Sequence, residues 1–357
     1  MSDFTVIPHA KMYHDKVVLY DELYGYVRKG NSTSFHADDQ YRSNYRGVMS
    51  AGARKKIKTI INLWFVALYS KKFLSRKNEE WLRYQITFAT LTLPAMQVHT
   101  DKEIKRDMLN RFFIELKRKC NVTSYLNVCE KQENKNIHFH ILFEKFIDWK
   151  VMRDLWNSIM NDNGYIEMYR NNQKHFHKDG FRLRPELLDK WSEEKQLLAY
   201  QYGMQTNWSN PNSTDIKDLE DKKNIAAYIT KYICKGVDEK LNEKMKQINK
   251  DLFTEEEIKM YRKQYLDELI MHYKIDGKVW SCSENLQQLE CTDFIVDNEI
   301  ADVLQDLLYG KDKDVFKGDN FSVAKGNVLK NLKNKSPTYY KQFMETQNKN
   351  YQLIYNN

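Results

Sequence analysis

Apolar and polar positions alternate with two different periods along this chain, and the period separates strands from helices. Residues 137–143 alternate apolar side chains with histidines, which is the two-residue period of a strand whose faces differ. Residues 86–93 mix threonine with apolar side chains and stop at Pro94, which predicts a second strand. Residues 123–130 predict a third. The short polar turn 131–136 makes this third strand the partner of residues 137–143.

Apolar residues elsewhere recur every three or four positions, which predicts amphipathic helices. The clearest are residues 53–74, whose ends are crowded with lysines, and residues 101–119. The remaining predicted elements are helices over 149–160 and 238–273 and short strands over 164–168 and 277–283.

This pattern divides the chain into three segments. Residues 1–80 hold a weakly periodic, polar arm over the first 45 residues and then the basic helix. Residues 81–286 form the central domain, which includes a polar insertion over residues 171–222. Residues 287–357 form a C-terminal extension of short helices and lysine-rich loops, and we expect its last fifteen residues to lack order.

Composition narrows the class of protein. The chain has 357 residues, of which 41% are hydrophobic and 30% charged, as in globular proteins. No apolar run approaches the roughly 20 residues that span a bilayer, and we expect neither a membrane partner nor a secretory signal. The five cysteines form no Cys-x-x-Cys, which favours a reducing, cytoplasmic location. The net charge of +8 permits a polyanionic partner.

The strand 137–143 carries a candidate metal site. Alternation places His138 and His140 on one face, with their backbones about 7 Å apart. Glu130, at the end of the paired strand, is the third donor that we favour, and Glu133 in the turn is the alternative. Two imidazoles and a carboxylate leave open positions that suit Mn²⁺ or Mg²⁺ working on a phosphoryl group, although zinc would also bind.

A second His-x-His occurs at His175-Phe176-His177. Its neighbours are the polar residues of the insertion, which predict a loop with no alternation. We therefore interpret this pair as a surface feature and not as a metal site.

Residues 226–235 predict a helix with a stripe of phenols and ammonium groups. Tyr228, Lys231, Tyr232 and Lys235 fall within an arc of about 100°. A tyrosine oxygen can attack a phosphodiester in line, and nearby positive charge assists both the phenol and the phosphoryl oxygens. Two tyrosines on one face allow two successive strand transfers, and the covalent link keeps the energy of the broken bond.

Together these motifs resemble the HUH endonucleases, the initiators of rolling-circle replication that carry His-hydrophobic-His. Residues 88–93 look like the first motif, His138-Phe139-His140 is similar to the second, and Tyr228-x-x-Lys231-Tyr232 is similar to the third. Residues 277–283 resemble a strand of the initiators of microvirus-type phages and small plasmids. The resemblance covers about residues 82–286.

The resemblance implies an α+β fold, with a central antiparallel sheet flanked by helices and mainly helical additions at both ends. It also implies that His138, His140 and Glu130 bind the metal, that Tyr228 and Tyr232 are nucleophiles, and that Lys231 assists at the phosphate. The family nicks single-stranded origin DNA, stays attached to the 5′ phosphate and frees a 3′ hydroxyl. One departure is that many relatives carry proline where this chain has Ile137.

No phosphate-binding loop accompanies these motifs, because the Gly-x-x-x-x-Gly segments that begin at Gly25 and Gly47 lack the required lysine. We therefore expect no ATPase, and we expect a host helicase and polymerase as partners. A transposase or relaxase with the same chemistry and a non-catalytic origin-binding protein remain alternatives, and the sequence leaves the oligomeric state open.

Overall fold

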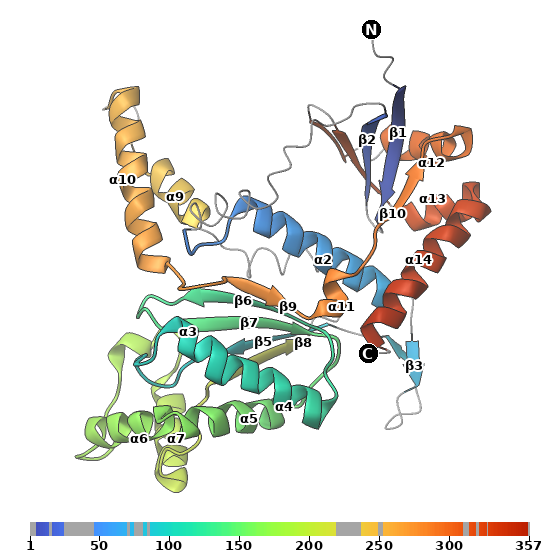
Figure 1. Ribbon diagram of the computed structural model, residues 1–357. Helices are drawn as coiled ribbons and strands as arrows, with labels where there is room; N and C mark the ends of the chain where they lie inside the picture. Colours follow the sequence, from blue (N-terminus) through green and yellow to red (C-terminus); the bar gives the residue numbers. More distant parts are fainter. Residues whose placement is uncertain are drawn as a thin grey trace.

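The structure is a computed structural model (Figure 1), in which most of the chain can be described. The described residues are 5–13, 16–24, 46–69, 72–74, 81–83, 86–218, 237–248, 253–309, 314–318, 321–326 and 328–355.

The central domain is built on a five-stranded antiparallel sheet, which confirms the predicted α+β class. The predicted strands 86–93, 123–130 and 137–143 all lie in it. Its strands in spatial order are β8 (Thr214–Asp218), β5 (Thr87–Leu91), β7 (Ile137–Phe143), β6 (Tyr125–Lys131) and β9 (Trp280–Cys282).

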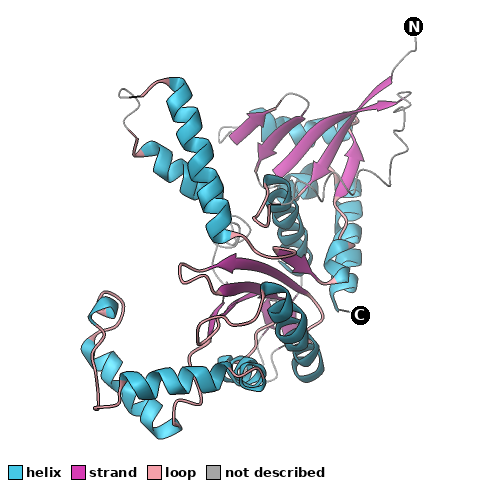
Figure 2. Cartoon of the chain, turned by 60° about the vertical axis from the view of Figure 1, so that its left-hand side comes forward, coloured by secondary structure: helices cyan, strands magenta, loops and turns pink. Residues whose placement is uncertain are grey.

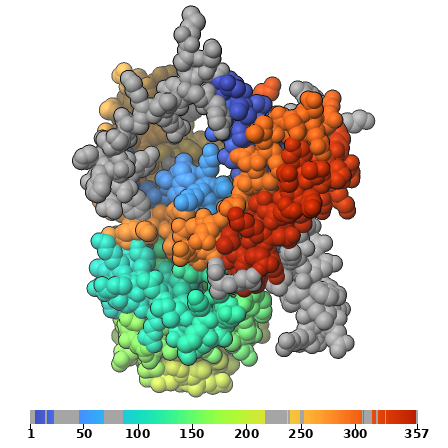
Figure 3. All heavy atoms as spheres, turned by 45° about the vertical axis from the view of Figure 1, so that its right-hand side comes forward, coloured from blue at the N-terminus to red at the C-terminus, as the bar shows by residue number. Residues whose placement is uncertain are grey.

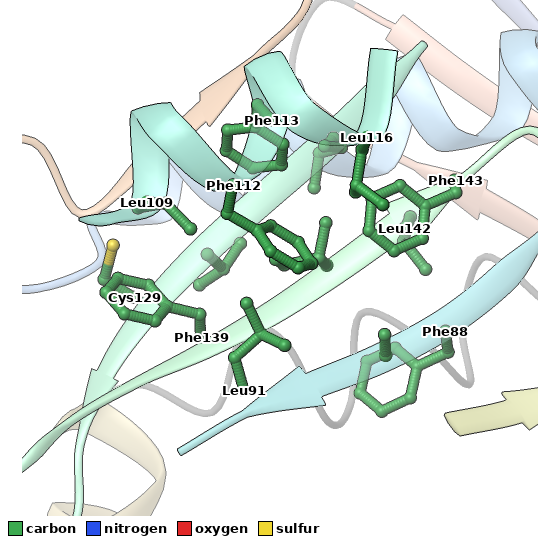
Figure 4. Close-up of a cluster of buried hydrophobic side chains, with 14 of the residues drawn as sticks. Phe88, Leu91, Leu109, Phe112, Phe113, Leu116, Cys129, Phe139, Leu142 and Phe143 are labelled. Carbon is green, nitrogen blue, oxygen red and sulfur yellow. The ribbon is translucent and has the colours of Figure 1, made fainter. Parts of the chain in front are cut away.

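Helices cover both faces of this sheet (Figure 1). On one face, Trp156 packs edge-on against Phe112 and Phe139, with ring centroids 5.6 and 6.2 Å away. Figure 4 shows this apolar layer between helix and strands. The helices of this face are α3 (Asp101–Glu103), the π-helical turn η1 (Ile104–Leu109), α4 (Asn110–Cys120) and α5 (Trp149–Asp162).

The opposite face packs against α2 (Ala51–Tyr69). Ile57 and Trp64 of this helix are fully buried in the same core as the central sheet. Val66 belongs instead to a second core. The predicted helix over residues 53–74 therefore ends early, at Tyr69, and α2 links two parts of the molecule.

The second core lies under another five-stranded antiparallel sheet, in which strands from both ends of the chain pair. Figure 3 shows the N-terminal strands beside the C-terminal segment in blue, orange and red. The sequence predicted an irregular arm for the first 45 residues, but two strands of eight and nine residues form there. The strands in spatial order are β10 (Thr292–Ile295), β1 (Thr5–Met12), β2 (Lys16–Tyr24), β12 (Phe321–Lys325) and β11 (Asp314–Lys317).

The last residues of the chain correct another expectation. We expected disorder over the final fifteen residues, but Pro337–Tyr355 form helix α14. Its buried positions Phe343, Gln347, Asn350 and Ile354 recur every three or four residues, so tertiary contact stabilises a segment that is polar overall. The helices that accompany it are α11 (Glu284–Gln287), α12 (Asn298–Tyr309) and α13 (Val328–Lys335).

Residues 164–168 correct a third prediction, because they begin helix α6 (Tyr165–Phe176) instead of forming a strand. Gly164, with φ +80°, ends the turn before this helix. Tyr165 and Ile166 are buried against the core. The polar insertion that follows is also largely helical, with η2 (Pro185–Leu187) and α7 (Glu193–Thr206).

Two helical projections flank the sheet on opposite sides (Figures 1 and 2). One contains α6 and α7. The other pairs α9 (Val237–Lys246) with α10 (Glu255–Tyr273), which agrees with the charged helices predicted over residues 238–273. A small hairpin, β3 (Lys72–Leu74) with β4 (Trp81–Arg83), completes the described elements. Among the described helices, none combines the length and apolar character needed to cross a membrane.

Candidate metal and nucleic-acid site

The hairpin of β6 and β7 brings the three predicted metal donors onto one face of the sheet. Glu130 stands directly opposite His138 in the antiparallel register. The rings of His138 and His140 lie 4.6 Å apart between centroids. His140 Nε2 is 3.1 Å from Glu130 Oε2. The alternative donor Glu133 lies exposed in the turn.

Glu130 carries its negative charge in this environment. Burial opposes ionisation of the carboxyl, but the hydrogen bond from His140 and the charges nearby offset burial, so the pKa of Glu130 lies below its usual value. An ionised carboxylate only accepts hydrogen bonds, so His140 Nε2 is assigned as the donor. Its Nδ1 then faces the Thr90 hydroxyl of β5 at 3.4 Å. Thr90 thus orients the imidazole from the neighbouring strand, a role that the sequence pattern did not reveal.

His138 is held as a neutral imidazole. Burial lowers its pKa to about 4, with a further contribution from His140. Its Nδ1 is buried and has no hydrogen-bond partner. A buried polar atom without a partner is uncommon in folded proteins, and neutral imidazole is the form that binds a metal.

The donor set matches a divalent ion in kind, with one carboxylate and two imidazoles on adjacent strands. In the described part of the chain, no three His, Cys, Asp or Glu side chains already form a metal-binding cluster. Glu130 and His140 instead bond to each other. An ion at this point therefore requires them to exchange that hydrogen bond for coordination.

A polar network fixes the turn that joins Glu130 to His138. Gln97 accepts from the Ile137 N–H at 2.7 Å, and its own N–H donates to Asn136 Oδ1 at 2.8 Å. Asp101 accepts from Gln97 Nε2 at 2.8 Å and from Lys131 Nζ at 2.7 Å. The side chains of Lys131 and Asp101 are only 12% and 6% exposed. The residues that flank the donors are thus held by buried, paired groups.

Helix α9 reaches the same end of the sheet. Val237 and Lys240 line a hollow of ≈ 40 Å³ together with Glu130 and Lys131, which is room for a water molecule or a small ion. Lys240 lies over the Tyr273 ring, with Nζ 3.8 Å from the centroid. Its charge also lowers the pKa of Glu130. No spacing in the sequence pointed to Lys240, because it joins this site only through the fold.

The predicted nucleophile stripe lies outside the described residues, so Tyr228, Lys231, Tyr232 and Lys235 carry no structural assignment. The described residues on either side of it both belong to this part of the molecule. Asp218 ends β8, which pairs with β5. Val237 begins α9 in the hollow beside Glu130.

The second His-x-His lies at the end of helix α6 and not in the predicted loop. His175 is exposed. His177 packs among the aromatic rings of Phe181, Tyr200 and Trp208. The two imidazoles therefore face different surroundings, unlike those of His138 and His140.

Comparison with known proteins places the central segment in a family. No curated protein and no solved structure matches the chain. Residues 86–237 match the family model of the ORF2-type replication-associated proteins. The matched segment begins one residue before β5, contains the Glu130, His138 and His140 site, and ends at the first residue of α9. Through this segment, the chain belongs to the ORF2-type family of phage replication-associated proteins, for which DNA is the implied partner.

Proposed function

We propose that this protein nicks single-stranded origin DNA by tyrosine attack and thereby initiates rolling-circle replication. The observation that carries the proposal is the contact of Glu130 with His140 beside neutral His138, within the segment that matches a family of replication proteins. Site and family point to the same chemistry on the same polymer.

The reaction exchanges one phosphodiester for another. The phenolic oxygen of Tyr228 or Tyr232 attacks the phosphorus, the bond from phosphorus to the 3′ oxygen breaks, and the phenol releases its proton. The 3′ oxygen takes up a proton and becomes the priming hydroxyl, while the 5′ phosphate remains on the tyrosine. The other tyrosine can repeat the exchange to cut and rejoin the strand at the end of a round.

Charge around the phosphate governs the rate of such a transfer. A phenol with a pKa near 10 is mostly protonated at neutral pH, so Lys231 and Lys235 would favour its ionised form. Glu130, His138 and His140 would hold Mn²⁺ or Mg²⁺, and the ion when bound supplies Lewis-acid polarisation of a phosphoryl oxygen. Glu130 keeps its charge and His138 its free lone pair, which are the states that ligation needs.

The test is covalent capture of DNA. The purified chain is incubated with Mn²⁺ or Mg²⁺ and labelled single-stranded oligonucleotides that tile its own replicon, and the products are separated under denaturing conditions. We expect one oligonucleotide to yield a shifted, covalent band and a shortened fragment with a free 3′ hydroxyl. No covalent band from any oligonucleotide would remove the proposed function.

A matched pair of variants assigns the nucleophile. Replacing both Tyr228 and Tyr232 with Phe should abolish the adduct and leave non-covalent binding intact, because only the attacking oxygens are lost. Replacing Tyr261, an exposed tyrosine of α10, with Phe should change nothing. An adduct that persists in the double variant would contradict the assignment.

A further inference from the structure

The pocket richest in aromatic side chains in the described structure is formed by α6, α7 and the segment between them, away from the histidine site. Its volume is ≈ 510 Å³, within the range of small-molecule sites. His177, Phe181, Tyr200 and Trp208 line it. The His177 ring is nearly parallel to those of Trp208 and Phe181, with interplanar angles of 9° and 13°.

The pocket is positively charged. Its lining contains three arginines and no aspartate or glutamate. Arg184 and Arg182 lie over the Phe176 ring, with their guanidinium carbons 4.2 and 5.1 Å from its centroid. Arg153 donates to the side chain of Asn212. The Nε of Arg153 is buried and has no hydrogen-bond partner, so one donor of the pocket has no acceptor within the described protein.

The backbone is shaped to keep the indole of Trp208 in this wall. Asn207 and Trp208 both have positive φ, at 49° and 50°, which is rare for a bulky side chain. A methyl group on Gly203 would meet the Trp208 indole at 2.2 Å. Such backbone conformations persist where the surrounding structure enforces them, and they cluster at functional sites.

The floor of the pocket leads to the histidine sheet. Asn210 and Asn212 line the pocket and precede β8. The Thr92 N–H donates to the Ser213 carbonyl at 2.9 Å, and Asp215 pairs with Thr90, the neighbour of His140. Asn212 is thus three residues, about 10 Å of strand, from the row that contains His140.

We propose that this pocket binds one unpaired base of single-stranded DNA by stacking, with the arginines at the adjoining phosphates. Aromatic faces combined with positive charge are the features that hold single strands without need of a particular sequence. A base that stays paired in a duplex cannot enter a pocket of this size. An acidic or apolar peptide would leave the aromatic planes or the arginines, respectively, without a complementary group. The identity of the strand rests on the proposed function.

The first experiment measures non-covalent binding by the full chain in EDTA, where no adduct forms. Fluorescence anisotropy compares a labelled single strand, its duplex and an RNA strand of the same sequence over a salt series. Tyr200→Ala should weaken single-strand binding about 10-fold with an unchanged salt slope, because it removes stacking only. Arg182→Ala should weaken binding and reduce the slope by about 0.7, because it removes one phosphate contact. Duplex binding should change in neither variant.

Controls separate the pocket from general effects. Tyr261→Ala and Arg118→Ala remove an exposed tyrosine of α10 and an exposed arginine of α4, and both should leave affinity unchanged. If Tyr200→Ala melts below the wild-type protein, Arg182→Gln replaces an exposed side chain and carries the test alone. Losses under 2-fold in both pocket variants, or equal losses on duplex DNA or only on RNA, would overturn the proposal.

Photo-crosslinking locates the base directly. A single strand that contains 5-iodouracil should crosslink to Phe181, Tyr200 or Trp208, and crosslinks confined to other segments would contradict the pocket assignment. The outcome is independent of the proposed function. Adduct formation with an unused pocket removes only this inference, whereas crosslinks in the pocket without any adduct remove only the nicking reaction.

Discussion

Two His-x-His pairs of the same spelling lie in different structures in this molecule. His138 and His140 occupy a strand and point to one face, where their rings are 4.6 Å apart and Glu130 bonds to one of them. His175 and His177 occupy the end of a helix, where one is exposed and the other is enclosed by aromatic rings. Residues two apart are on one side of a strand but about 200° apart around a helix. A metal-ligand motif therefore has meaning only with its backbone.

The sharpest test of this contrast removes one imidazole at a time. His138→Ala or His140→Ala should reduce the rate of covalent DNA capture in Mn²⁺ by more than about 100-fold, beyond the loss typical of groups that only support a ligand. His175→Ala should leave the rate unchanged. The rate is read from single-turnover time courses on denaturing gels. Equal losses in all three variants would erase the distinction between the pairs.

The framework around the first pair offers the next largest effect. Asp101→Ala leaves the buried Lys131 ammonium without its 2.7 Å partner and should lower the free energy of unfolding by about 3 kcal/mol. The matched control is Glu290→Ala, which breaks an exposed pair with Lys349 of 2.8 Å and should cost at most about 1 kcal/mol. Urea denaturation measures both. Similar losses would show that Asp101 does not secure the turn.

The surroundings of the second pair are tested by adding a methyl group. Gly203→Ala forces the Trp208 indole away from α7 and should destabilise the protein by about 1–3 kcal/mol, with a change in tryptophan fluorescence. Gly52→Ala, in α2, meets only the Ser50 hydroxyl oxygen at 4.0 Å and should stabilise by about 0.5–1 kcal/mol. A Gly203→Ala protein of unchanged stability and fluorescence would contradict the close contact.

The smallest expected effect concerns the orientation of His140. Thr90→Val removes the hydroxyl 3.4 Å from Nδ1 and should weaken the metal dependence of DNA capture by about 10-fold. The rate at saturating Mn²⁺ should change less than the concentration needed for half of it. Thr90→Ser, which keeps the hydroxyl, should restore wild-type behaviour. If Val and Ser behave alike, Thr90 does not position the ring.

Particular elements show where sequence reasoning succeeded. The strands over 123–130 and 137–143 and the helix over 149–160 were predicted within a few residues, because alternation and helical periodicity are local signals. Residues 164–168 and the final fifteen residues were wrong for a shared reason. Both are polar segments with few apolar positions, and burial against distant parts of the chain makes them helical.

The sequence by itself determined the chemistry-bearing side chains of the histidine strand and their shared face, since a two-residue period fixes which side chains point together. It also set out the tyrosine and lysine stripe, which stays a prediction. Only the tertiary structure decided which carboxylate meets an imidazole, and it brought Thr90, Lys240 and the Asp101–Lys131 pair to the same end of the sheet. It likewise paired the first strands of the chain with the last and enclosed His177 in a pocket. Most of these contacts join residues far apart in the sequence, so no local period records them.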